Sequence, residues 1–437
     1  MILKNRPPPN GSTRGVRLRS ATVRLLRRLW KVAPLPTAVR RRAHLALYAV
    51  APQTRSAVEL TGLSAAAADV SPRAPRDIPA GDFILSGFLT DHSGVGRGAR
   101  LSAEAFRRAG LAPRLHDLRQ NPDGWGRREP GGVWFAHCNA PEAAHFLLRS
   151  EDPRGCYRVG YWAWELPRLP QAWAEIAKLF HEIWTPSAFV AGAVRSAAPE
   201  VPVHIVPHPL PGVDRVTPER TALGFPDGTF VFLSMFDVRS SATRKNPRAA
   251  IEAFQTAFDP DDGSVRLALK VNAQEDGRAP VRELEAAAAG WRNIQLIDRV
   301  LSDEGALRLL ASADAFVSLH RSEGFGMAIA EAMALGRPVI ATDWSGNRDF
   351  CQQGVIPIPF SLVPVVDPTG VYVAPQDLWA EPDLTAAADA MRRLADDHAW
   401  AASLGRTGRA HIRTILPRSY PVEPFRRWLR QPPQTPS

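Results

Sequence analysis

An alternation between short apolar runs and helix-like stretches constrains the fold of this chain more than any other feature. The pattern begins at Asp82 and restarts at Phe230, after a Pro- and Gly-rich connector at 208–212. The runs that indicate strands are 83–88, 133–137, 157–162, 182–184 and 203–206 before the connector, and 230–236, 265–271, 294–297, 315–319 and 338–341 after it. Strands that alternate with helices at this spacing form parallel sheets with helices on both faces.

Two such halves predict an α/β protein with two doubly wound, Rossmann-like domains that face each other across a cleft. In sheets of this kind ligands bind beyond the carboxyl ends of the strands, so we expect the chemistry to lie between the halves. The predicted organisation is a basic arm and linker at 1–80, a first Rossmann-like domain at 81–212, a second at 213–415, and a C-terminal helix with a tail at 416–437. We expect this last helix, at 422–430, to pack back on the first domain.

The positive charge of the chain is concentrated at its N-terminus. The whole sequence carries a formal charge of +10, but residues 1–58 hold 13 Lys and Arg and no acidic residue, so residues 59–437 carry −3. The high pI therefore does not indicate that the body of the protein binds nucleic acid. Within 1–58, apolar residues alternate with Arg at roughly helical spacing, which predicts a basic amphipathic helix that can lie on an anionic membrane surface. Two alternatives stay open, a basic tail without structure and a start codon placed upstream of the native start.

Further sequence features favour a cytoplasmic location. No run of 18 uncharged apolar residues occurs, and Arg interrupts every candidate core of a signal peptide. Cys138, Cys156 and Cys351 are too few and too widely spaced for a disulfide framework or a zinc pattern, which favours a reducing compartment. We expect a cytoplasmic protein that binds the inner face of the plasma membrane peripherally through its basic arm.

A first glycine-bearing segment, SGVGRG at 93–98, follows the first predicted strand and precedes a helical stretch at 99–109. Gly94 and Gly96 allow close backbone approach of a ligand, and N–H groups at a helix start bind phosphate. The segment falls one position short of GxGxxG, and Asp117 lies near the place where a dinucleotide fingerprint needs an acidic residue. A dehydrogenase therefore stays open here, as does a tight strand-to-helix turn without a ligand.

A second glycine-bearing loop, at 318–326, is followed by an apolar helical stretch at 327–336 in which Glu331 is the single charged residue. Gly324 and Gly326 free the backbone at the helix N-terminus, whose dipole attracts anions. A carboxylate at Glu331 is costly to bury unless it accepts hydrogen bonds, and sugar hydroxyls would donate them. The alternative is that Glu331 pairs with a structural arginine.

Glu323 and Glu331 form an E-x7-E pair within the stretch EGFGMAIAEAMALGRPVIATDWSGNRDF. This stretch closely resembles the donor-site signature of the retaining glycosyltransferases of family four, which have the GT-B fold. Four other stretches are similar to the same family in the same order, namely 94–100, 161–190, 236–254 and 379–383. In the second of these, Glu165 could face the cleft. The resemblance covers about residues 82–430 and excludes the basic arm.

The resemblance implies that the second half binds a nucleotide-sugar donor, such as a UDP- or GDP-sugar, and that the first half binds most of the acceptor. By position, Glu331 would bind the ribose hydroxyls of the nucleoside. Glu323 and the backbone of Gly324, Phe325 and Gly326 would contact the donor sugar.

The resemblance also implies a basic pair on the donor diphosphate, where fixed cations stabilise the charge that develops as the glycosidic bond breaks. Lys245 aligns well, and its partner is either Arg239 or Arg244; we favour Arg239, although the family's spacing is five and Arg239 precedes Lys245 by six. At the end of its predicted strand, His137 would lie near the reacting sugar. Asn139 is a rival for that place, and a packed strand-end histidine is the alternative.

The leading hypothesis is a retaining glycosyltransferase that acts on a polysaccharide, a glycolipid or a similar acceptor. No carboxylate pair supports a double displacement, and Asp259-Pro260-Asp261 has the composition of a turn, so we predict no required metal or cofactor. Other enzymes weighed are a phosphorylase-like or epimerase member of the GT-B fold and an oxidoreductase. The alternative from another class is a non-catalytic, nucleotide-sugar-binding or scaffold subunit of a glycan assembly machine.

Overall fold

The computed structural model describes residues 71–126, 131–210, 213, 216–272, 278–368, 372 and 376–430, which belong to one compact unit, Glu59–Ser437. The predicted membrane-binding arm and most of the predicted linker, at 1–70, lie outside the described residues. Over the residues that the structure does describe, no helix is both long enough and apolar enough to cross a membrane.

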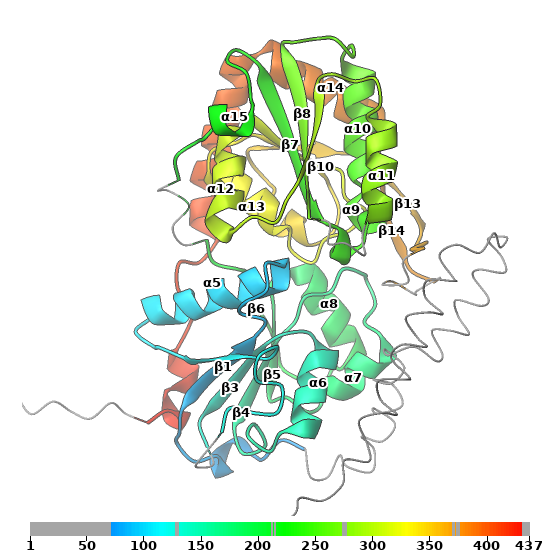
Figure 1. Ribbon diagram of the computed structural model, residues 1–437. Helices are drawn as coiled ribbons and strands as arrows, with labels where there is room; N and C mark the ends of the chain where they lie inside the picture. The colour runs from blue at the N-terminus through cyan, green and yellow to red at the C-terminus, as the bar shows by residue number, and fades with distance from the viewer. Residues whose placement is uncertain are drawn as a thin grey trace, which may run out of the picture. The chain divides into compact units, whose positions relative to one another are not determined.

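The first half is a six-stranded parallel sheet with the strand order β2-β1-β3-β4-β5-β6 (Figure 1). The strands are β1 (Phe83–Gly87), β2 (Arg114–Asp117), β3 (Val133–His137), β4 (Tyr157–Tyr161), β5 (Glu182–Thr185) and β6 (Val203–Ile205). The helices between them are α5 (Gly94–Arg108), α6 (Ala140–Arg149), α7 (Gln171–Ala177) and α8 (Ala188–Ala197). Because β1 lies between β2 and β3, the carboxyl ends of β1 and β3 form the switch point of this sheet.

Alternate side chains of these strands are buried on opposite faces of the sheet, because successive residues of a strand point to opposite sides. Ile84 and Trp134 pack with α6, α7 and α8, whereas Leu85 and Phe135 pack with Phe106 of α5. Both faces are therefore covered, which explains why β1, β3 and β4 are buried along their whole length.

The second half is another six-stranded parallel sheet, with the order β12-β11-β10-β7-β8-β9. Its strands are β7 (Phe230–Asp237), β8 (Val265–Asn272), β9 (Ile294–Asp298), β10 (Ala315–Ser318), β11 (Val339–Thr342) and β12 (Val355–Ile358). Its helices are α9 (Ala242–Lys245), α10 (Pro247–Ala257), α11 (Arg278–Ala287), α12 (Asp303–Ser312), α13 (Met327–Ala334), α14 (Leu384–Asp396) and α15 (His398–Ile415). The prediction of two doubly wound domains is confirmed.

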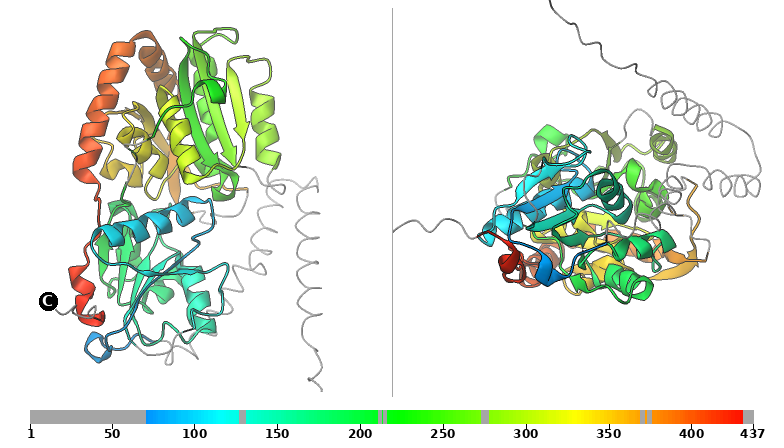
Figure 2. Two further views of the ribbon diagram at one scale, coloured as in Figure 1. Left: turned by 60° about the vertical axis from the view of Figure 1, so that its left-hand side comes forward. Right: turned by 90° about the horizontal axis from the view of Figure 1, so that it is seen from below.

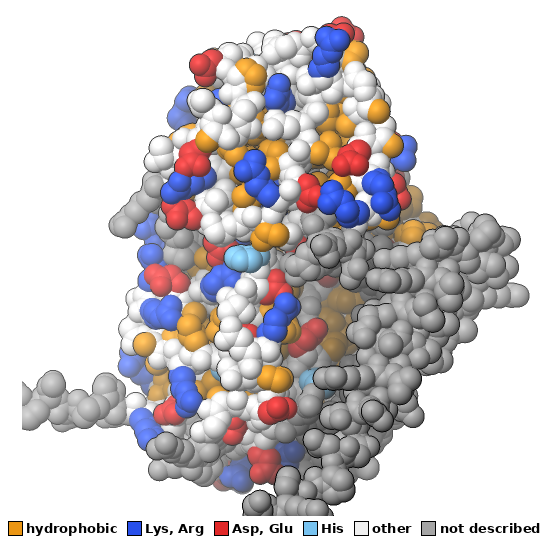
Figure 3. Space-filling model, in the orientation of Figure 1, with side chains coloured by type: hydrophobic (Ala, Val, Ile, Leu, Met, Phe, Trp, Pro, Cys, Tyr) orange, Lys and Arg blue, Asp and Glu red, His pale blue; other side chains and the backbone are white. Residues whose placement is uncertain are grey.

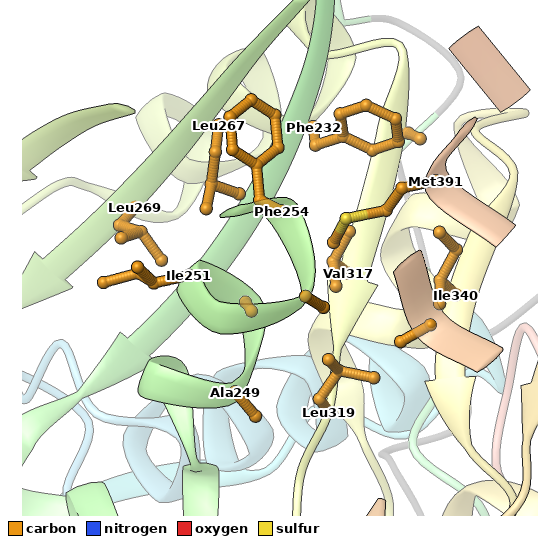
Figure 4. Packing of buried hydrophobic residues seen from close by; sticks show 14 of the residues in the cluster. Phe232, Ala249, Ile251, Phe254, Leu267, Leu269, Val317, Leu319, Ile340 and Met391 are labelled. Carbon is orange, nitrogen blue, oxygen red and sulfur yellow. The ribbon is translucent and has the colours of Figure 1, made fainter. Parts of the chain in front are cut away.

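The second sheet is also packed on both faces. On one face, Phe254 of α10 and Met391 of α14 lie against Phe232, Leu267 and Val317 of the strands (Figure 4). On the other face, the intervening residues of β7 and β10 pack with α12, α13 and α15. The helices that follow β7 and β10 therefore cover opposite faces, and the carboxyl ends of these two neighbouring strands form the switch point of the second sheet.

The described parts of the chain depart from the sequence-based prediction at several places, among them the strands β2 and β12, which were not predicted. Helix α5 begins at Gly94, capped by Ser93, so the predicted glycine loop at 93–98 is the first turn of the helix. An antiparallel hairpin of β13 (Phe360–Pro364) and β14 (Leu378–Pro382) was not predicted. The predicted C-terminal helix at 422–430 is a short 3-10 helix, η7 (Glu423–Trp428).

This C-terminal segment packs against the first half, as Figure 2 shows for its red ribbon beside the blue strands. Trp428 stacks on Tyr157 with the ring centroids 3.6 Å apart, and Phe425 is fully buried. Leu429 forms a parallel bridge with Gly81. The two halves are therefore joined by the connector after β6 and again by the chain that follows α15.

The face drawn in Figure 3 carries basic and acidic side chains intermixed over both halves. Several pairs lie four residues apart on helix surfaces, at spacings that bring side chains together: Glu104 with Arg108, Arg248 with Glu252, and Glu304 with Arg308. The surface therefore mixes both signs, in agreement with the small net charge of residues 59–437.

Candidate active site

The second glycine-bearing loop, at 318–326, is the predicted donor loop, and it lies at the switch point of the second sheet, between the carboxyl ends of β7 and β10. Glu323 follows β10, and its side chain is 9% exposed. Two consecutive residues of α9, which follows β7, contact its two oxygens. Lys245 donates from Nζ to Oε1 in a short contact, and Arg244 donates from Nη1 to Oε2 at 3.2 Å. Glu323 is thus the centre of a buried cluster of one carboxylate and two cations.

The cluster keeps Glu323 ionised at every pH near neutrality. Burial alone would raise the pKa of this carboxyl, but the charges of Lys245 and Arg244 outweigh burial and lower the pKa to about 2. A carboxylate held by two cations orients its neighbours and is a poor nucleophile, because its lone pairs are already engaged.

The side chains of Arg244 and Lys245 differ in their exposure and in the number of groups that hold them. Arg244 is 2% exposed and also donates to the carbonyl oxygens of Ser322 at 2.6 Å and Ser240 at 3.1 Å, so it braces the backbone on both sides of the switch point. Lys245 is 23% exposed and can turn toward a ligand. The side chain of Arg239, the predicted partner of Lys245, lies outside the described residues.

Glu331, in α13, accepts from an arginine of the first half. Nε and Nη2 of Arg97 both lie 2.6 Å from its Oε1, and Nη1 of Arg97 lies 3.2 Å from Oδ1 of Asp303. Arg100 completes the group with two hydrogen bonds to Asp303, at 2.8 and 2.7 Å. The sequence left an arginine partner for Glu331 open but did not identify Arg97, which is 234 positions away.

The glycines of the first segment have different surroundings. A Cβ on Gly94 would meet nothing within 4 Å, whereas a Cβ on Gly96 would lie 2.3 Å from the carbonyl oxygen of Asp91. Gly96 is thus required by the packing of the chain itself. A Cβ on Gly98 would lie 2.8 Å from Nε2 of His137 and 2.8 Å from Cε1 of His208, so α5 approaches both histidines closely.

His137 ends β3 at the switch point of the first sheet, and it is 3% exposed. Its Nδ1 lies 2.9 Å from Oγ of Ser102, and its ring stacks on Tyr161 at 4.3 Å. Burial, together with the nearby His208, holds the pKa of His137 well below its usual value, so the imidazole is neutral at neutral pH. Asn139, the rival candidate, accepts a hydrogen bond from the backbone N–H of Ala163 at 2.9 Å and so holds the segment after β4.

Sequence reasoning missed His208, which it treated as part of a connector. His208 is 6% exposed, and its ring lies edge-to-face with that of Phe325 in the donor loop, with 5.1 Å between centroids. Burial lowers its pKa to about 3. Its Nδ1 is 3.3 Å from the hydroxyl of Tyr161. The sequence could have indicated His208, because His208-Pro209 follows the last strand of the first half, at the edge of the sheet where ligands of such sheets bind.

The donor-loop glycines place the loop against the first half. Gly326, at φ +92°, precedes α13 in a left-handed conformation that favours glycine. A Cβ on Gly324 would lie 3.1 Å from the carbonyl oxygen of Trp164, and the carbonyl of Gly324 accepts from Oγ of Ser187 at 2.6 Å. The loop and the first half are therefore in direct contact.

Glu165 does face the donor loop. Its carboxylate accepts from the hydroxyl of Tyr372 at 2.8 Å and lies 4.0 Å from Arg244. Its backbone carbonyl accepts from Oγ of Ser322 at 2.5 Å. Glu165 therefore links the first half to the cluster around Glu323.

The acidic run that begins at Asp259 forms a turn, closed by a hydrogen bond from the N–H of Asp262 to the carbonyl of Asp259 at 3.2 Å. No group of three or more His, Cys, Asp or Glu that could hold a metal ion occurs among the residues that the structure describes.

Comparison with known proteins agrees with this geometry. Residues 229–397 match the family model described as glycosyl transferases group 1. No curated protein matches the chain.

Several solved structures share the fold at low sequence identity. HepE of Anabaena, crystallised with UDP and glucose, is 13% identical with a TM-score of 0.55, and the alignment covers 77% of this chain and 95% of that one. A glycosyltransferase of Rickettsia africae is 11% identical with a TM-score of 0.56, and the alignment covers 78% of this chain and 95% of that one. Sucrose-phosphate synthase of Thermosynechococcus elongatus is 16% identical with a TM-score of 0.54, and the alignment covers 78% of this chain and 93% of that one. The fold that the chain shares with these proteins is GT-B, and residues 229–397 are similar to the glycosyl transferases group 1 family.

Proposed function

We propose that this protein is a retaining glycosyltransferase that moves a sugar from a nucleotide-sugar donor to a saccharide or lipid-linked acceptor. The second half, 213–415, holds the donor, and the first half, 81–212, holds most of the acceptor. Glu331 receives the ribose hydroxyls, while Glu323 and the backbone of 324–326 contact the donor sugar. The observation that carries the proposal is the buried cluster of Glu323, Lys245 and Arg244 at the switch point, where ligands of doubly wound sheets bind.

In the proposed reaction, the bond between the anomeric carbon and the donor phosphate oxygen breaks. The acceptor hydroxyl oxygen bonds to the anomeric carbon on the same face, and its proton passes to the departing phosphate oxygen. Lys245 stabilises the charge that grows on the diphosphate. Because Glu323 is ionised and engaged by two cations, its role is to orient the sugar rather than to attack it. The neutral His137, at the end of β3, lies near the reacting sugar in this proposal.

Three further observations support the proposal. The group 1 domain match covers the half that bears both glutamates. HepE, which shares the fold, has been crystallised with UDP and glucose, so a UDP-sugar is the first donor to test. The contacts of Ser187 and Glu165 with the donor loop bring the first half against the proposed sugar site.

The basic arm suggests where the acceptor lies. A basic amphipathic segment gains affinity from anionic lipid, which would hold the enzyme near a lipid-linked glycan at the inner face of the membrane and serve polysaccharide synthesis. Sedimentation with vesicles of phosphatidylglycerol and phosphatidylcholine tests this. We expect binding by the full chain that is lost when 1–58 are removed, and equal binding by both forms would contradict the assignment.

A ligand panel with a turnover assay tests the function. UDP, GDP, ADP and their sugar conjugates are screened by thermal shift against the native protein and Glu331→Gln, since a ligand at 100 times its Kd stabilises a protein by about 2.7 kcal/mol. We expect one nucleotide family to stabilise the native protein far more than the variant, and its sugar conjugate to be consumed when acceptor is present. Binding of the intact donor with no turnover on any glycan or glycolipid acceptor would instead indicate a scaffold subunit.

A further inference from the structure

Arg97 makes the closest contact between Glu331 and the first half. Its side chain is 13% exposed, that of Glu331 is 5% exposed, and both Nε and Nη2 of Arg97 donate to the same oxygen, Oε1, at 2.6 Å. No described residue donates a hydrogen bond to the other oxygen, Oε2. The carboxylate is thus fixed through one oxygen while the other keeps its lone pairs for a further donor.

The environment of Glu331 explains why it needs this partner. Apolar residues flank it in α13, and an unpaired carboxylate in such a place is strongly disfavoured relative to its neutral form. Burial raises the pKa of Glu331, and the charge and hydrogen bonds of Arg97 oppose that rise. Arg97 is the one cation among the described residues that pairs with Glu331. Without it, the carboxyl would tend to hold a proton and lose its strength as an acceptor.

A neighbouring arginine provides a natural comparison. Arg100 lies three residues further along α5, on the same face of the helix, and also reaches the second half. It binds Asp303 through two hydrogen bonds and donates to the carbonyls of Leu89 and Asp91, but it does not contact Glu331. Arg100 therefore ties the halves together without touching the proposed ribose site, and Arg97 does both.

We propose that Arg97 is a positioning residue for nucleotide recognition, which orients Glu331 through Oε1 so that the ribose hydroxyls donate to Oε2. This inference rests on the proposed function, in which Glu331 receives the ribose. It assigns a role to a residue of the acceptor half in binding the donor. Nucleotide binding then depends on the contact between the halves.

The test compares the affinity for nucleotides with and without ribose hydroxyls. UDP, GDP and ADP are each compared with their 2′,3′-dideoxy counterparts by titration calorimetry, on the full-length native protein and on Arg97→Met, Arg97→Lys, Glu331→Gln and Arg100→Met. Hydrogen bonds to a charged group are worth about 1.5–3 kcal/mol, so the native protein should prefer the ribose form roughly 10- to 100-fold. Arg97→Met and Glu331→Gln should both reduce that preference to about 2-fold or less. Arg100→Met should keep it, and Arg97→Lys should restore part of it.

The possible results separate this inference from the proposed function. If Glu331→Gln loses the preference and Arg97→Met keeps it, the role of Arg97 is wrong and the ribose contact stands. If Arg97→Met binds the ribose form more tightly than the native protein, Arg97 competes with the nucleotide and the inference is also wrong. If none of the three nucleotides binds the native protein with a ribose preference, or if Glu331→Gln keeps it, the proposed donor site itself fails. Should Arg97→Met not fold, Arg97→Lys carries the same comparison, with a smaller expected drop.

Discussion

Lys245 and Arg244 are adjacent in the sequence and contact the same carboxylate, but they have different freedom to meet a substrate. Arg244 is engaged by two backbone carbonyls as well as by Glu323, whereas Lys245 keeps 23% of its side chain exposed. We therefore expect Lys245→Met to lower the turnover number about 100-fold, as removal of one charge-stabilising donor commonly does. Steady-state kinetics with the donor identified by the ligand panel measures this.

Arg248 supplies the matched control for Lys245. It lies three residues further on, is 71% exposed and pairs with Glu252 on the helix surface, where such pairs contribute little. Arg248→Met should leave the turnover number within about 2-fold of the native value. Equal losses in the two variants would show that the general positive charge of this region matters rather than the contact of Lys245 with the cluster.

The ionisation of Glu323 makes a prediction about acid stability. Its folded-state pKa of about 2 lies below the ordinary value of 4.5, so its contribution is present above the ordinary pKa and is lost as the pH falls through the folded value. That contribution is on the order of 3 kcal/mol. Denaturant unfolding between pH 6 and pH 2 should show a steeper loss of stability in the native protein than in Glu323→Gln. Identical pH profiles for the two proteins would contradict the ionised cluster.

At the residue scale, the sequence predicted the candidate glutamates but not their partners. The E-x7-E spacing places Glu323 and Glu331 around the start of one helix, which is local information. The pairing of Glu331 with Arg97 depends on how the two halves meet across 234 positions, and no local pattern records that. Lys245 was a candidate from the sequence, because it lies in a short segment after a strand of the same domain, and in the structure it contacts Glu323.

At the scale of elements, the N-terminal part of α5 packs closely against His137 and His208 at Gly98. A methyl group on Gly98 would lie 2.8 Å from atoms of both His137 and His208, whereas one on Gly94 would meet no neighbour. Gly98→Ala should therefore destabilise the protein by about 1–3 kcal/mol, through overpacking, and lower turnover by displacing His137. Denaturant unfolding measures the first effect and steady-state kinetics the second.

Gly94→Ala is the control within the same turn. Alanine has the higher helix propensity and has room here, so stability should stay unchanged or rise by up to about 1 kcal/mol. A loss of stability as large as that of Gly98→Ala would contradict the close fit at the histidines and indicate a general need for flexibility in this turn.

Most strands with strong apolar runs could be predicted. β1 and β3 are buried on both faces and carry such runs, and β4, of sequence YRVGY, is buried in the same way although it contains Arg158. β12, of sequence VIPI, was not predicted. β2 is an edge strand of sequence RLHD, half exposed, and has no such run. The hairpin of β13 and β14 is exposed at Leu362 and Leu378 and contains Pro at the ends of its strands, which breaks the usual strand pattern.

At the scale of the whole Glu59–Ser437 unit, three contacts join the two halves near the proposed donor site. They connect Arg97 with Glu331, Ser187 with Gly324, and Glu165 with Ser322, in each case a residue of the first half with a residue of the second. Such contacts are formed by segments far apart in the chain, so the fold class predicted two halves that face each other but not the residues that join them. In the proposed function, these contacts would bring the acceptor and the donor sugar together, as transfer between two substrates requires.

In the proposed reaction, the transferred sugar keeps its anomeric configuration. Proton NMR that follows the reaction from its first minutes, with the donor identified by the ligand panel and a glycan or glycolipid acceptor, tests this most directly. We predict a new glycoside whose anomeric coupling constant matches that of the donor, formed about 100-fold more slowly by Lys245→Met. A product of inverted configuration, or release of the nucleotide with free sugar as the only product, would contradict it.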